Sequence, residues 1–124
     1  MDVALIVRRP WVDLILNGKK TWEMRSRMTN IRGVVGLIEA GSGLVFGEVE
    51  IVNSIPLSLR YLKDKIHKHQ VDDFSLLEKW NVAWVLKNEK RYINPVPYNH
   101  PKGAVVWVKL TEQVKENIER VRNG

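Results

Sequence analysis

The chain of 124 residues contains no cysteine. This absence excludes a disulfide framework, a thiol nucleophile and zinc sites built on thiolates, and it suits a reducing compartment. The sequence also lacks any apolar run near the roughly 20 residues that cross a bilayer. The apolar run at residues 3–7 is short, and Arg8 and Arg9 follow it, which is not the charge order of a secretory signal. We therefore expect a cytoplasmic protein with no membrane partner.

Repeats, low-complexity stretches and a linker rich in proline, glycine or serine are missing too. This predicts a single domain spanning residues 1–124, with one hydrophobic core. No phosphate-binding glycine loop and no nucleophile elbow occurs, and no cluster of Asp, Glu and His has the spacing of metal ligands. His67 and His69 flank Lys68 in a segment with helical periodicity, so we expect both to be solvated. The prediction is a domain without a metal or a cofactor.

Charge of one sign is in excess: 20 Lys and Arg face 14 Asp and Glu, which gives a formal net charge of +6. A basic surplus of this kind favours polyanionic partners such as nucleic acid. The surplus is moderate, so it does not by itself identify the partner.

The periodicity predicts five or more strands interleaved with short helices. The expected strands are residues 3–7, 20–25, 34–40, 44–52, 82–86 and 104–110. The expected helices are residues 10–16, 57–69, 74–80 and 111–122, with Ser58, Asp73 and Thr111 as N-terminal caps. A loop with three prolines is expected at 94–103. Strands outnumber strand–helix–strand units, so the α+β class with a small, curved and mostly antiparallel barrel is favoured over a doubly wound sheet.

The densest group of chemically useful side chains lies in Gly-Lys-Lys-Thr-Trp-Glu-Met-Arg at residues 18–25. Lys20 can hold a phosphate, or act as a base if burial lowers its pKa. Glu23 can accept from an exocyclic amine or take a proton, and Arg25 can bind a phosphate or Glu23. A fully extended segment would place Lys20 and Glu23 on opposite faces, so a turn after Gly18 is needed to bring them together. The alternative is a structural ion pair at a barrel rim.

These residues match the pattern G-x-K-x-x-E-x-R, which resembles the signature of the ASCH family. The preceding Pro-Trp-Val-Asp-Leu-Ile-Leu-Asn at residues 10–17 also resembles that family's first helix. The resemblance implies a PUA-like β-barrel with a cleft near the motif. It also implies RNA binding: some members resemble ribonucleases, and some small ones are amidohydrolases that remove an acyl group from N4-acylated cytidine. The motif residues carried over are Gly18, Lys20, Glu23 and Arg25.

One departure concerns the amidohydrolases of that family, which carry a nucleophilic threonine three residues after the motif lysine. This sequence has Glu23 at that position, and Thr21 stands at a different spacing. The hydrolytic set of those enzymes therefore does not transfer residue by residue to this chain.

Aromatic and loop residues supply further candidates for ligand binding. Trp11 follows two arginines at the start of a helix, so it can stack an unpaired base or pack in the core. Trp107, within Val-Val-Trp-Val, is expected to be buried. Tyr98 and His100 lie in the proline-rich loop, where either could contact a ligand or merely shape a turn.

Three functions follow from this sequence. The leading prediction is binding of RNA or a nucleotide in a basic cleft, with ribonuclease-like cleavage. The alternatives are an amidohydrolase acting on N4-acylated cytidine or a related modified nucleoside, and a protein-interaction module that uses the same cleft. If the protein is a hydrolase, Lys20 and Glu23 are its candidate catalytic residues. The candidate ligand-binding residues are Arg9, Trp11, Arg25, Tyr98 and His100.

Overall fold

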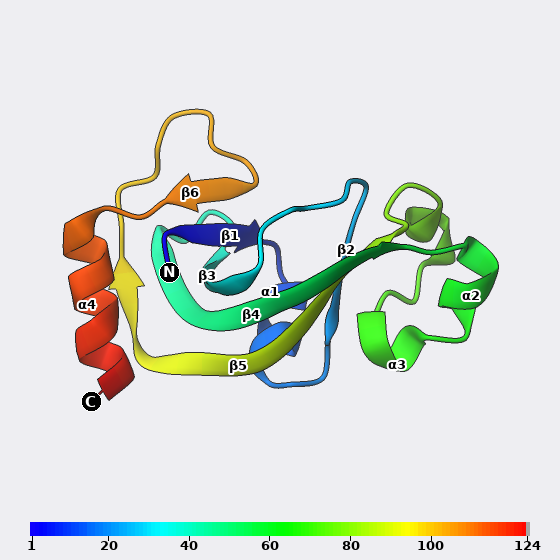
Figure 1. The fold of residues 1–124 in the computed structure, drawn as a ribbon, viewed down its shortest axis with the longest axis horizontal. Helices are drawn as coiled ribbons and strands as arrows, with labels where there is room; N and C mark the ends of the chain where they lie inside the picture. Colours follow the sequence, from blue (N-terminus) through cyan, green and yellow to red (C-terminus); the bar gives the residue numbers. More distant parts are fainter. Residues whose placement is uncertain (124) are drawn as a thin grey trace.

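Six strands form one sheet in the computed structural model, which describes residues 1–123. The strands are β1 (Val3–Val7), β2 (Trp22–Arg25), β3 (Gly33–Glu39), β4 (Leu44–Pro56), β5 (Val82–Pro97) and β6 (Trp107–Lys109). Their order is β2-β5-β4-β3-β1-β6; β1 and β3 are parallel and the other neighbours are antiparallel. The sheet curls into a half-barrel (Figure 1), which confirms the predicted α+β class with a curved, mostly antiparallel sheet.

Close backbone approach shapes the middle of the sheet. At Gly47 of β4, a β-carbon would lie 2.4 Å from the carbonyl oxygen of Lys90 and 2.6 Å from a methyl group of Leu16. Only glycine therefore fits there without moving β5 or the first helix. The ladder between β4 and β5 also contains register shifts. Such irregularities bend a strand and increase its twist, which suits a curled sheet.

Helices lie at the ends and the rim of this sheet. They are α1 (Trp11–Leu16), α2 (Leu59–Lys63), α3 (Ile66–His69), the 3-10 helix η1 (Phe74–Glu78) and α4 (Glu112–Asn123). The side chains of Ser58, Asp73 and Thr111 accept hydrogen bonds from backbone N–H groups in the first turns of α2, η1 and α4, which confirms all three as predicted caps. No helix among residues 1–123 combines the length and apolar character needed to cross a membrane.

Residues 57–80, which we call the helical arm, pack against β2 and β5. A hydrophobic cluster joins Leu62, Val71 and Leu77 of the arm to Trp22 and Met24 of β2. In Figure 1 the arm lies at one end of the molecule and α4 at the other. This contact places the arm directly beside the motif at residues 18–25.

The structure differs most from the sequence-based prediction in three elements. The expected helix at 57–69 is two helices, α2 and α3, separated by Asp64 and Lys65. Strand β5 continues to Pro97, so residues 94–97 of the expected loop belong to this strand, and Val96 and Pro97 pair with Val45 and Leu44 of β4. Prolines are tolerated there because β2 pairs with β5 only at residues 82–85, which leaves the far part of β5 at a sheet edge. Strand β6 has only three residues, and Trp107 within it is half-buried where we expected full burial.

Candidate functional site

A tight turn after α1 sets the geometry of the motif. Gly18 has a φ of +82°, a left-handed conformation that favours glycine. The N–H of Lys20 then donates to the carbonyl of Leu14 at 2.9 Å, and the chain enters β2 at Trp22. Lys20 therefore lies in the turn, outside the alternation of the strand. The turn is the one that the sequence requires if Lys20 and Glu23 are to meet.

Glu23 lies between two cations. Its Oε1 is 3.7 Å from the Nζ of Lys20, an ion pair too long for a hydrogen bond, and its Oε2 accepts from the Nε of Arg25 at 2.9 Å. A second nitrogen of Arg25 donates to the carbonyl of Ile6 in β1 at 2.8 Å. Lys20 and Glu23 are 2% and 5% exposed, so these two charges are largely shielded from water. The ion pairs among Lys20, Glu23 and Arg25, which the sequence analysis gave as the structural alternative, are present, and they lie at the wall of a cavity.

His69 of α3 positions the Lys20 ammonium group, which donates to the backbone carbonyl of His69. The ring of His69 is also fixed: Nδ1 accepts from the N–H of Val71 at 2.9 Å, so Nε2 carries the proton and bonds to the carbonyl of Leu62 at 2.7 Å. His69 is fully buried, so the expectation that it is solvated is wrong. Its polar atoms tolerate burial because each has a partner. His67, by contrast, is exposed as predicted.

Burial alters the acid–base chemistry of Lys20. Desolvation lowers the pKa of Lys20 to about 8 from its ordinary 10.5, the nearby carboxylate of Glu23 opposes this shift, and the charge of Arg25 adds to it. A lysine ammonium can donate three hydrogen bonds. One of these goes to His69, so Lys20 keeps donor capacity for an oxygen atom of a ligand.

A cavity of about 610 Å³ opens over this cluster. Its lining residues come from β1, the turn after β3, α1, β2, the helical arm and the loop before β6: Ile6, Arg8, Trp11, Lys20, Glu23, Met24, Arg25, Ala40, Gly41, Val71, Lys79, Trp80, His100, Ala104 and Val105. Four of these side chains are lysine or arginine, and one is a carboxylate that is already paired. The cavity is therefore electropositive.

Aromatic rings form part of the wall and its support. Trp11 and Trp80 both line the cavity and meet edge to face, with ring centroids 5.5 Å apart. Behind Arg25, the ring of Trp84 lies 5.4 Å from the guanidinium carbon, and Trp107 stacks on Trp84 at 5.8 Å. The half-buried Trp107 thus supports the ring on which Arg25 rests.

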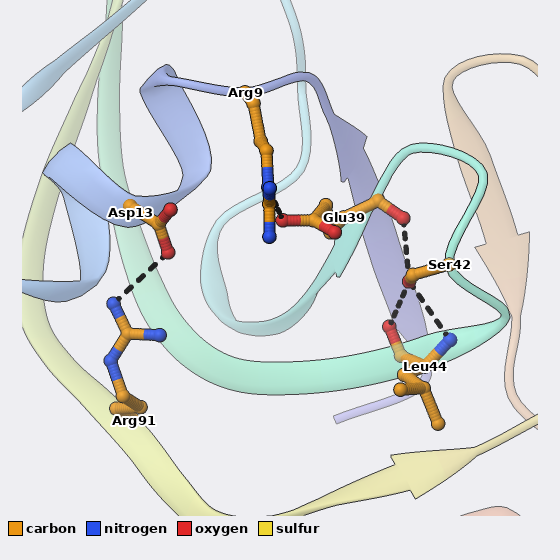
Figure 2. Close-up of polar contacts among 6 residues, drawn as sticks. All are labelled: Arg9, Asp13, Glu39, Ser42, Leu44 and Arg91. Atoms are coloured by element: carbon orange, nitrogen blue, oxygen red, sulfur yellow. Dashed lines mark hydrogen bonds and ion pairs between the residues drawn. The ribbon is translucent and has the colours of Figure 1, made fainter.

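Five of the seven residues singled out from the sequence line this one cavity: Trp11, Lys20, Glu23, Arg25 and His100. The side chain of Arg9 instead pairs with Glu39 at 2.5 Å, as Figure 2 shows, and it is 73% exposed. In the same view Arg91 of β5 donates to Asp13 of α1 at the surface. Arg9 is therefore engaged outside the cavity, and Arg8 is the arginine of this pair that lines it.

Tyr98 does not line this cavity itself but contacts His100, which does. Its hydroxyl bonds to Nδ1 of His100 at 2.7 Å, and Nε2 of His100 bonds to the carbonyl of Ala104 at 2.9 Å. Both ring nitrogens of His100 are thus engaged, and the residue offers a ligand its ring rather than a free nitrogen. Tyr98 itself lines a second cavity of about 280 Å³ between the loop and α4.

Sequence reasoning missed three residues of the wall: Arg8, Lys79 and Trp80. Arg8 and Lys79 are exposed, and neither forms an ion pair with a residue of the described range 1–123. The sequence did contain a pattern that could have identified them: Lys79 and Trp80 place a basic residue beside a tryptophan, as residues 8–11 do before and at Trp11. Within the same range, no group of three or more histidine or acidic side chains is arranged to hold a metal ion.

Comparisons with known proteins agree on one family. The model described as ASCH domain matches residues 5–119. Among solved structures, the crystal structure of ASCH from Zymomonas mobilis has a TM-score of 0.72 at 12% identity, and the match covers 96% of this chain and 94% of that one. A serine-to-alanine mutant of that protein matches with the same TM-score and identity, over 95% and 94% of the two chains. A search of curated proteins finds no match.

Proposed function

This chain belongs to the ASCH domain family, which is generally associated with RNA binding. We propose that it binds single-stranded RNA by taking one unpaired nucleotide into the cavity beside Lys20. The observation that carries the proposal is the cavity itself. The cavity has a volume of about 610 Å³. It is lined by tryptophan rings, four cationic side chains and a paired carboxylate. Aromatic rings beside cations are the combination that stacks a base and holds its phosphate.

The base and the phosphate of a nucleotide each have a partner in this cavity. The base can stack against Trp11 or Trp80, a contact worth about 1–3 kcal/mol. The exposed cations Arg8 and Lys79 at the rim suit the phosphate. Glu23 can accept a hydrogen bond from an exocyclic amine of cytosine or adenine. A duplex would hide the base from these groups, so the proposed ligand is a single strand.

Salt dependence tests the phosphate contacts. The logarithm of the RNA-binding constant K falls linearly with the logarithm of the salt concentration. We expect Arg8→Gln and Lys79→Gln each to reduce the steepness of this slope by about 0.7, the contribution of one phosphate on a single strand. The measurement is fluorescence anisotropy with a labelled single-stranded RNA at several salt concentrations. Arg120→Gln in α4 removes the same charge from an exposed position and serves as the control.

Two results would contradict this proposal. The first is an affinity of the wild-type protein that does not respond to salt. The second is a slope that Arg8→Gln and Lys79→Gln change no more than Arg120→Gln does.

A hydrolase is the second candidate, because the pKa of Lys20 is lowered to about 8 and Lys20 lines the cavity. About a tenth of such lysines are neutral at pH 7 and can act as a general base. For an N4-acylated cytidine, neutral Lys20 would take a proton from water as the water oxygen bonds to the acyl carbon. The carbon–nitrogen bond then breaks, and the leaving amine takes that proton from the Lys20 ammonium to give cytidine and a carboxylic acid. On RNA, the same base would take the proton of a 2′-hydroxyl group as its oxygen bonds to the adjacent phosphorus. The bond from phosphorus to the 5′-oxygen then breaks, and that oxygen takes the proton from the Lys20 ammonium.

Product analysis tests the hydrolase. The protein is incubated with short RNAs and with N4-acetylcytidine, and the products are identified by mass spectrometry. We expect turnover to rise with pH up to about 8, where Lys20 loses its proton, and to disappear in Lys20→Met. A melting curve of the variant verifies that it folds. Absence of product from both substrates would reject catalysis and leave the binding function.

A further inference from the structure

The first half of the helical arm, residues 59–69, carries a concentration of positive charge. Within α2, α3 and the two residues between them lie Arg60, Lys63, Lys65 and Lys68, against the single carboxylate of Asp64. None of these four cations forms an ion pair with another residue of the described range 1–123. At the opposite end of the molecule, Lys115 and Arg122 of α4 are both paired with carboxylates. No carboxylate of the described residues neutralises these four cations, so they can bind a polyanion.

Aromatic rings lie among these cations. Tyr61 is 46% exposed, and its ring stacks on Trp22 of β2 with centroids 6.5 Å apart. The ammonium group of Lys65 lies 5.2 Å from the ring of Tyr61, and that of Lys68 lies 5.2 Å from the ring of Trp22. A base that stacks on Tyr61 can displace the flexible chain of Lys65 and free its charge for a phosphate.

The arm lies directly beside the motif whose residues line the cavity. The carbonyl of Lys68 accepts from the N–H of Thr21 at 3.0 Å, and the next carbonyl, that of His69, accepts from the ammonium of Lys20. The amide of Gln70 donates to the carbonyl of Lys19 at 3.2 Å. Consecutive residues of α3 thus contact the motif and the wall of the cavity. Figure 1 shows α3 beside β2 at the end of the molecule away from α4.

We propose that this surface, formed by Arg60, Tyr61, Lys63, Lys65 and Lys68, is a second RNA contact that binds the backbone and one base of a neighbouring nucleotide. The inference rests on the proposed function of the cavity and extends it. The ligand is a strand of several nucleotides, because a free nucleoside in the cavity would not reach the arm. The arm supplies charge and a stacking ring, so it recognises a single strand without selecting its sequence.

The test compares ligands of two lengths. Binding of cytidine monophosphate and of a single-stranded RNA octanucleotide is measured for the wild type and for Lys65→Gln/Lys68→Gln. We expect the double variant to bind the octanucleotide on the order of 10-fold more weakly at low salt, with a slope of log K against log salt reduced by about 1.4. Its affinity for the mononucleotide is expected to be unchanged. Lys109→Gln/Arg120→Gln, with the same charge change on β6 and α4, is the matched control.

Trp11→Ala separates this inference from the proposed function. It removes a cavity ring and is expected to weaken binding of both ligands. An octanucleotide affinity that falls equally in the arm variant and in the matched control would overturn the arm contact. A wild type that binds neither ligand would overturn both proposals. Octanucleotide binding that depends on the arm but not on Trp11 would overturn the cavity proposal and support the arm surface alone.

Discussion

Replacing Glu23 by glutamine is expected to lower the free energy of unfolding by about 3 kcal/mol at pH 7, the range for removing one member of a buried ion pair. Glu23 is 5% exposed and is the carboxylate that neutralises both Lys20 and Arg25. Glutamine keeps a hydrogen-bond acceptor for Arg25 and removes only the charge. The Lys20 ammonium then loses the carboxylate that opposes the lowering of its pKa, so burial disfavours the charged form still more. Urea denaturation of the two proteins gives the difference.

The loss should shrink at pH 9, because the pKa of Lys20 is about 8 and its ammonium is then largely neutral in both proteins. Glu39→Gln is the matched control: Glu39 pairs with the exposed Arg9 at the surface, where an ion pair contributes about 1 kcal/mol or less. A loss at pH 7 no larger than that of Glu39→Gln would show that Glu23 does not offset buried charge.

The second large effect is a rise in stability with pH. Burial holds the pKa of Lys20 at about 8 in the folded chain, against 10.5 when it is unfolded. Between these values the unfolded state carries a proton that the folded state has released, so the free energy of unfolding increases as pH rises. Below pH 8 the folded protein bears the full cost of the buried ammonium. We expect a gain of about 2–3 kcal/mol between pH 8 and pH 10 from this group.

The measurement is a series of urea denaturations of the wild type and of Lys20→Met from pH 7 to pH 10, and the quantity of interest is the difference between the two proteins. The window ends there because burial also raises the pKa of Tyr92, whose contribution has the opposite sign above pH 10. If the two proteins show parallel curves from pH 8 to pH 10, the pKa of Lys20 is not lowered and the hydrolase candidate loses its support.

Local spacing in the sequence was enough to predict much of the fold. Strand β1, the hairpin of β3 and β4, and the three caps follow from patterns only a few residues long. The extent of β5 could not be predicted in this way, because its residues beyond Leu86 are extended by pairing with β4. The break between α2 and α3 and the burial of His69 likewise arise where the arm packs against β2.

For the candidate site, the sequence by itself determined the motif: Gly18 makes the turn, and Lys20, Glu23 and Arg25 follow within seven positions. Only the tertiary structure decided what surrounds them. The carbonyl that holds Lys20 comes from His69, 49 residues away, and Trp80 of the arm joins Trp11 at the cavity. Periodicity reports which face of an element is buried, but not which distant element covers it. That covering removes water from Lys20, and loss of water is the largest cause of its lowered pKa.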